Sequence, residues 1–106
     1  MTDKELNLRA GLATFSDAGE TGAANLEDFD PINSTDDLVR LLISTGISFH
    51  RPSKTDIVAC TNDQSVEVKI QDGKDLAAAA RAARELAASW VNDDDVKAWK
   101  IATGRN

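Results

Sequence analysis

The chain has 106 residues, a length that fits one domain and lets a folded chain bury about 65% of the surface exposed when it is unfolded. Its formal net charge is -6, from 18 acidic and 12 basic residues, so the summed field repels polyanions and favours basic partners. Cys60 is the only cysteine, which excludes an internal disulfide and predicts a reducing, cytoplasmic compartment. The opening stretch MTDKELNLRAGLATF mixes charges of both signs without a continuous apolar run, so we expect neither a signal peptide nor a membrane span.

The N-terminal part of the chain alternates between periodic and irregular patterns. A capping-box pattern and leucines at helical spacing predict a first helix over residues 3–14. Small and acidic residues follow over 16–25, where we expect a flexible acidic linker. The stretch LEDFDPI, residues 26–32, predicts an irregular docking segment because its proline restricts the residue before it to extended geometry. We therefore divide the chain into an N-terminal helix, linker and docking segment, 1–33, and a core domain, 34–106.

The core domain begins with a helix and continues with strands. A second capping pattern predicts a short amphipathic helix over residues 34–45, and Gly46 suits the left-handed position just past its end. Three runs of strand-forming residues follow at the spacing of an antiparallel meander: ISFHR, DIVACT and SVEVKI. The middle run is apolar on both faces, which leaves open whether Ile57 or Val58 points towards the helices.

An alanine-rich helix is predicted over residues 73–91, with Asp72 as its cap and one apolar stripe that runs from Leu76 to Trp90. We expect Arg84, off that stripe, to be solvated. A last short helix begins at a run of three aspartates and turns a valine and a tryptophan inward. The predicted fold is α+β: a three-stranded antiparallel β-meander packed against helices in the order α-α-β-β-β-α-α, as a single compact domain.

The order of helix, three-stranded meander and alanine-rich helix is similar in topology to a double-stranded RNA-binding domain. In that family a cluster of lysines opens the last helix and grips phosphates, and the loop between the first two strands enters the minor groove. The resemblance implies that nucleic acid would be bound by His50, Arg51, Lys54 and Lys74. Lys74 is followed by Asp75 where the family pattern has another cation, and phosphate contacts dominate such affinity, so nucleic acid is the disfavoured partner.

The sequence offers no constellation for catalysis or metal binding. His50 is the only histidine, and with Cys60 it supplies at most two of four zinc ligands. The acidic runs lack the alternating ligands and central glycine of a calcium loop, and helix capping accounts for them. We therefore expect a chain that is not an enzyme and that holds no cofactor and no metal, although a small enzyme of another class stays an alternative.

The segment 26–32 carries three apolar side chains on an acidic background after the linker. It suggests a displayed anchor for a partner, or alternatively a cover for the second face of the sheet over Ile57 or Val58. On the first interpretation the chain is a small acidic protein-binding module that binds a protein with a basic or apolar groove. It would act as an adaptor, assembly factor or inhibitor, of the kind found among bacterial or phage accessory proteins. The predicted partner-binding residues are Leu26, Glu27, Asp28, Phe29, Asp30, Ile32, Asp36, Asp37, Asp93, Asp94 and Asp95.

Overall fold

Short polar side chains cap the starts of the first two helices. The computed structural model describes residues 1–15 and 26–104, so the predicted linker at 16–25 lies outside the described residues. In helix α1, Asp3–Thr14, the hydroxyl of Thr2 accepts a hydrogen bond from the backbone N–H of Glu5. In α3, Thr35–Thr45, Ser34 accepts from the N–H of Asp37, and Gly46 ends the helix with a φ of 72°. Both predicted helices are confirmed.

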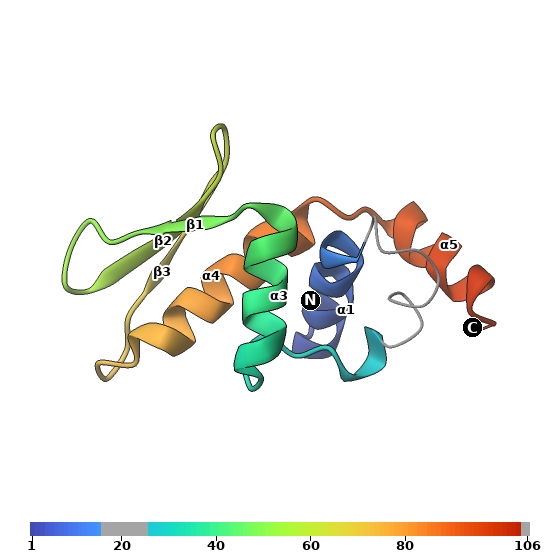
Figure 1. Ribbon diagram of the computed structural model, residues 1–106, viewed down its shortest axis with the longest axis horizontal. Helices are drawn as coiled ribbons and strands as arrows, with labels where there is room; N and C mark the ends of the chain where they lie inside the picture. The colour runs from blue at the N-terminus through green and yellow to red at the C-terminus, as the bar shows by residue number, and fades with distance from the viewer. Residues whose placement is uncertain (16–25, 105–106) are drawn as a thin grey trace.

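The remaining elements follow the predicted order along the chain, and Figure 1 shows their arrangement. A 3-10 helix, η1, precedes α3, and three strands and two helices follow α3. Their bounds are Leu26–Asp28 for η1, Ser48–His50 for β1, Asp56–Cys60 for β2, Ser65–Lys69 for β3, Asp75–Ser89 for α4 and Asp93–Ala102 for α5.

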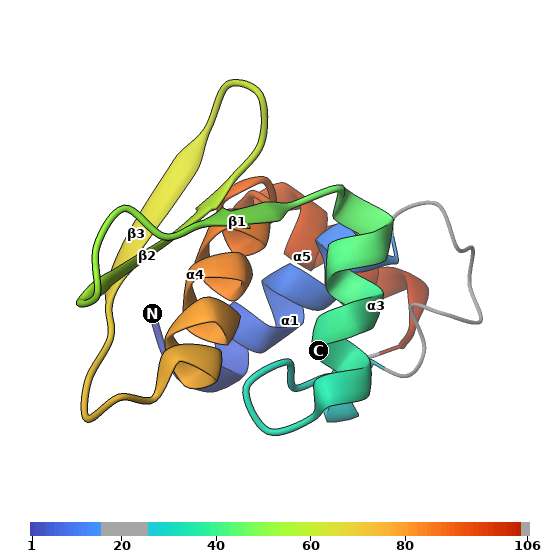
Figure 2. The same ribbon diagram turned by 60° about the vertical axis from the view of Figure 1, so that its left-hand side comes forward.

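The three strands form one antiparallel sheet in the order β1-β2-β3, as the alternating apolar pattern predicted. Phe49 lies opposite Ala59, and Ala59 lies opposite Val66, so these residues share the face that packs on α4. Ile57 and Ala59 are buried while Val58 is half-buried, which answers the question that the sequence left open. In Figures 1 and 2 the described helices lie on one side of the sheet.

The alanine-rich helix α4 is the centre of the fold. It packs on β2 and β3 with one side and on α1 with the other, and the alanines from Ala78 to Ala88 are all buried. Small side chains let the axis of α4 approach both the sheet and α1 closely. A single apolar stripe would cover only one side of the helix. The predicted stripe and cap were wrong in part: Leu76 is exposed, and Asp72 has a φ of 55° in the turn before the helix, whose N-cap is Lys74.

The C-terminal helix α5 begins with a complete capping box. Asn92 accepts from the N–H of Asp95 at 2.8 Å, and the Asp95 carboxylate accepts from the N–H of Asn92 at 3.1 Å. Val96 and Trp99 are buried, as predicted. Among the residues that the structure describes, no helix combines the length and the apolar character that crossing a membrane requires.

Candidate protein-binding surface

The outer side of α3 carries aliphatic side chains that the core does not cover. Leu41 is fully buried and Leu38 and Leu42 are half-buried, so the helix packs by this row. Val39 and Ile43, four residues apart and therefore neighbours on the helix surface, are 46% and 77% exposed. The apolar part of α3 thus extends beyond the row that packing needs.

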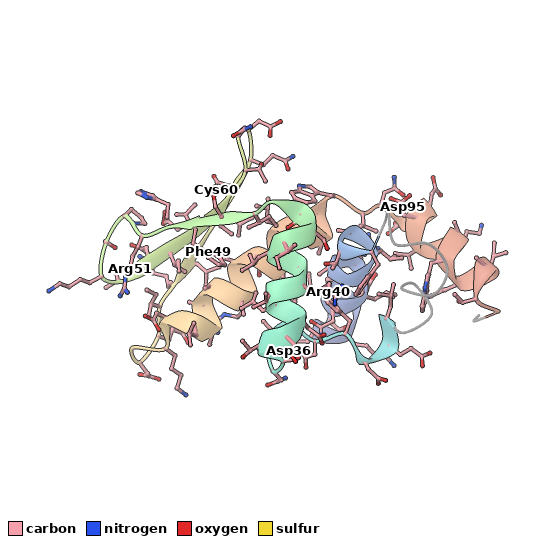
Figure 3. The ribbon with its side chains drawn as sticks, in the orientation of Figure 1. Asp36, Arg40, Phe49, Arg51, Cys60 and Asp95 are labelled. Carbon is pink, nitrogen blue, oxygen red and sulfur yellow. The ribbon has the colours of Figure 1, made fainter. Side chains whose placement is uncertain are left out.

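Two further apolar side chains lie on the elements that flank α3. Phe49 on the edge strand β1 is 37% exposed, and Figure 3 shows it beneath β1, on the side of α4. Leu76, in the first turn of α4, is 77% exposed. Asp75, the residue before Leu76, forms an ion pair with Arg51, with 3.4 Å between Arg51 Nη1 and Asp75 Oδ2. This ion pair brings the loop after β1 to the start of α4. We use the name apolar face for these four exposed apolar side chains on three elements: Val39 and Ile43 on α3, Phe49 on β1 and Leu76 on α4.

Opposite charges flank the aliphatic pair on α3. Asp36 precedes Ile43 by two turns and Arg40 precedes it by one, and both are exposed. Figure 3 shows Asp36 near the start of the helix and Arg40 on its flank. Within residues 1–15 and 26–104, neither side chain takes part in an ion pair or a side-chain hydrogen bond. Both charges are therefore available to a partner.

The predicted anchors Leu26 and Phe29 belong to the protein's own core, so the displayed-anchor hypothesis is wrong for them. Phe29 is 4% exposed and meets Phe15 edge-on, with ring centroids 5.6 Å apart. Both anchors close over Gly11 of α1, where a Cβ atom would lie 2.8 Å from Leu26 Cδ2. The alternative prediction, that the segment covers the sheet's second face, is also wrong, because it packs on α1. Ile32 is half-buried.

Several of the predicted acidic residues stabilise turns and helix starts. The Asp30 carboxylate accepts hydrogen bonds from the N–H groups of Ile32 and Asn33 and from the Asn33 amide, at 2.7–3.2 Å. Burial raises the pKa of Asp30, but these hydrogen bonds outweigh it and hold the pKa below its usual value. Asp37 accepts from the N–H of Asp30 at 2.9 Å. Asp30 and Asp37 are thus structural residues rather than free contacts.

The remaining predicted acids fall into two groups. Asp93 pairs with Arg9, and Asp95 closes the capping box of α5, so both hold the fold. The other four are exposed at separate places on the surface: Glu27 and Asp28 on η1, Asp36 on α3, and Asp94 on α5. The structure does not bring the predicted acids together into one patch.

The predicted nucleic-acid residues surround the loop between β1 and β2. His50, Arg51, Lys54 and Lys74 are all exposed, and the ion pair of Arg51 with Asp75 joins the loop to the start of α4, where Lys74 is the N-cap. Arg51, however, is bound by its own chain. Its guanidinium also donates to the carbonyls of Ser53 and Lys54, at 3.3 and 3.2 Å, in addition to Asp75.

Sequence reasoning missed two buried arginines that join the helices. Arg84 of α4 is buried, contrary to prediction, and donates to Asp3 Oδ1 at 3.0 Å and Asn7 Oδ1 at 3.1 Å on α1. Arg9 of α1 donates to the carbonyl of Val91 at 2.9 Å and to Glu5 and Asp93. Glu5 is close to Arg9 in the sequence, but the other partners of the two arginines lie far from them along the chain, so no local pattern marks their burial. They fix α1 to α4 and to the start of α5.

Cavities lie between the described helices. One cavity of about 430 Å³ lies between α1, η1 and α5, and Lys4, Leu8, Val96 and Lys100 are among its lining residues. In the described part of the chain, no group of three or more His, Cys, Asp or Glu residues could hold a metal ion. No family model matches the chain, and no curated protein or solved structure matches it significantly.

Proposed function

We propose that the chain is a non-catalytic protein-binding module and that it binds through the apolar face. The observation that carries this proposal is the exposure of Ile43 and Leu76, each 77%, on two helices that join at the same core. Apolar side chains that adjoin on the surface, as Val39 and Ile43 do on α3, mark protein contacts more often than single scattered ones do. Phe49 adds an aromatic side chain, the type enriched among energetically dominant interface residues.

The acidic character of the chain sets the chemistry of the partner. A net charge of -6 favours encounter with a basic surface, and Asp36 places one of these charges one turn before Val39 on α3. The complementary partner presents an apolar groove with basic residues at its rim. An adaptor, assembly factor or inhibitor would use such a contact. We place the module in the cytoplasm, because its single cysteine fits a reducing compartment.

The nucleic-acid alternative has less support on the same elements. In the topology that the chain shares with double-stranded RNA-binding domains, the first helix, the loop after the first strand and the start of the last helix face the ligand. Here those elements carry Val39, Ile43 and Leu76, and Asp75 neutralises Arg51. Phosphate contacts supply most of such affinity, so this surface favours protein over RNA.

Capture of partners by matched variants tests the proposal. The immobilised chain is compared with Ile43→Asp and with the control Ile101→Asp, which changes an isoleucine that is 69% exposed on α5, away from the apolar face. Half of each lysate from source cells is treated with nuclease. We expect one stoichiometric protein to be retained by the wild type and by Ile101→Asp, lost from Ile43→Asp, and unaffected by nuclease.

Two outcomes would contradict the proposal. Equal retention by Ile43→Asp would remove the apolar face from the interface. Loss of all retained material after nuclease treatment would favour nucleic acid, and binding should then depend on Lys54 and Lys74. Both isoleucines are exposed, so we expect either substitution to change the free energy of unfolding by no more than about 0.5 kcal/mol, which thermal denaturation checks.

A further inference from the structure

We infer that the outer side of α3 binds a second copy of this chain, in a two-fold symmetric, antiparallel helix pair. This inference rests on the proposed function because it uses part of the apolar face, Val39 and Ile43, although its occupant is a second copy of the acidic chain and not the basic-rimmed groove described above. It starts from four exposed residues of α3 at spacings of three and four: Asp36, Val39, Arg40 and Ile43. Such a spacing places them on one side of a helix.

Two-fold symmetry demands a self-complementary surface, because each patch meets an identical patch. A patch of one sign would repel its copy. The outer side of α3 has an aliphatic centre, Val39 and Ile43, with an acid and a base, Asp36 and Arg40, beside it. A surface that carries both signs next to apolar side chains can match itself when one copy is reversed.

The geometry of an antiparallel pair brings the unlike charges together. If the two-fold axis passes near Val39, the two valines meet at the centre of the interface. Arg40 of the second copy then lies at the level of residue 38 in the first copy, two residues from Asp36. At a rise of 1.5 Å per residue, this offset along the helix axis is about 3 Å. The arginine side chain spans that offset, and symmetry forms the contact twice. Ile43 covers the first turn of the opposing helix.

Within residues 1–15 and 26–104, the position of α3 leaves its outer side open to this contact. Figures 1 and 2 show α3 at the edge of the helical layer, with α1 and α4 on its inner side. Among the described residues, Asp36 and Arg40 make no ion pair with each other, although they are four residues apart on the same helix. The contact buries little surface besides one helix face, so the association is of the weak, reversible class.

Sedimentation equilibrium over a concentration range from micromolar to about 1 mM tests the inference, because weak dimers form in this range. We expect the wild type to change from monomer to dimer. Asp36→Arg and Arg40→Asp should each weaken the dimer about tenfold or more, because each places like charges opposite one another twice. The double variant, Asp36→Arg with Arg40→Asp, exchanges the charges and should restore the dimer. Ile43→Asp should abolish it, and Ile101→Asp should leave it unchanged.

The outcomes separate the inference from the function on which it rests. A wild type that stays monomeric overturns self-association, while capture of another protein that depends on Ile43 would still support the binding module. A dimer that both single charge variants weaken and the double variant fails to restore overturns the antiparallel arrangement. So does a dimer that responds to Ile43→Asp but to neither charge variant. Far-ultraviolet circular dichroism of each variant confirms that the monomer is folded.

Discussion

Replacing Phe29 by alanine tests whether the segment after the linker is part of the core. The ring is 4% exposed, packs edge-on against Phe15 and lies over Gly11, where a Cβ atom would be 3.2 Å from Phe29 Cδ1. Truncating a buried phenylalanine costs about 3–5 kcal/mol, including the cavity that it leaves. The substitution also removes the edge-on contact with Phe15, whose energy we include in that range. We therefore expect the free energy of unfolding to fall by about 4 kcal/mol.

A loss of this size is a large part of the total stability of a small domain, about 5–15 kcal/mol, and should lower Tm by roughly 20 °C. Urea denaturation followed by tryptophan fluorescence measures it, with calorimetry for Tm. The matched control is Phe49→Ala, since Phe49 is 37% exposed and should cost about 1 kcal/mol. A loss below about 1 kcal/mol for Phe29→Ala, or equal losses for both variants, would refute the assignment of Phe29 to the core.

Three other substitutions test the local contacts. Gly11→Ala should destabilise the protein by about 1 kcal/mol in urea denaturation. The new Cβ atom would lie 2.8 Å from Leu26 Cδ2, and we expect this clash to exceed the gain in helix propensity. A net gain in stability would mean that the Leu26 side chain shifts freely. Asn92→Ala should cost about 1 kcal/mol by removing the capping box of α5, and an unchanged midpoint would mean that packing alone holds that helix start. The lowered pKa of Asp30 contributes stability above its unfolded value near pH 4, and this is lost as pH falls through the folded value. Asp30→Asn should therefore lose less stability than the wild type between pH 6 and about pH 3, and parallel losses in urea denaturation would contradict this.

Local signals predicted most of the elements because their causes lie within a few residues. Thr2 and Ser34 accept hydrogen bonds from N–H groups three residues on, and Gly46 takes the left-handed conformation that ends α3. The alternation of valines with charged residues in SVEVKI specified a strand with one packed face. Such patterns need no knowledge of the rest of the chain.

Properties that depend on distant contacts could not be predicted in this way. Arg84 was expected to be solvated because it lies off the apolar stripe of α4, yet α1 covers it and supplies its hydrogen bonds from Asp3 and Asn7. A periodicity argument assumes one covered side, whereas α4 is covered on two. The burial of Phe29 could not be predicted for the same reason, because the exposure of an isolated apolar segment depends on which distant residues pack over it.

The candidate surface was missed for a related reason. The run LVRLLI in α3 predicts an amphipathic helix, but it holds more aliphatic residues than one packing row can bury. Its outer members, Val39 and Ile43, are distinguished from the inner ones only when the neighbours of α3 are known. The sequence instead predicted a binding surface made of acids. The carboxylates of Asp30, Asp37 and Asp95, however, form hydrogen bonds in turns and helix caps.

The central position of α4 explains why α3 remains available to a partner. Because α4 presents alanines to both the sheet and α1, these layers approach closely and the core closes around small side chains. Leu41 is then the one side chain of α3 that is completely buried, and it anchors the helix at the edge of that core. Val39 and Ile43, on the outer side of the helix, stay 46% and 77% exposed. On the proposed function, another protein or a second copy of this chain covers the exposed parts of Val39 and Ile43 and removes that apolar surface from water.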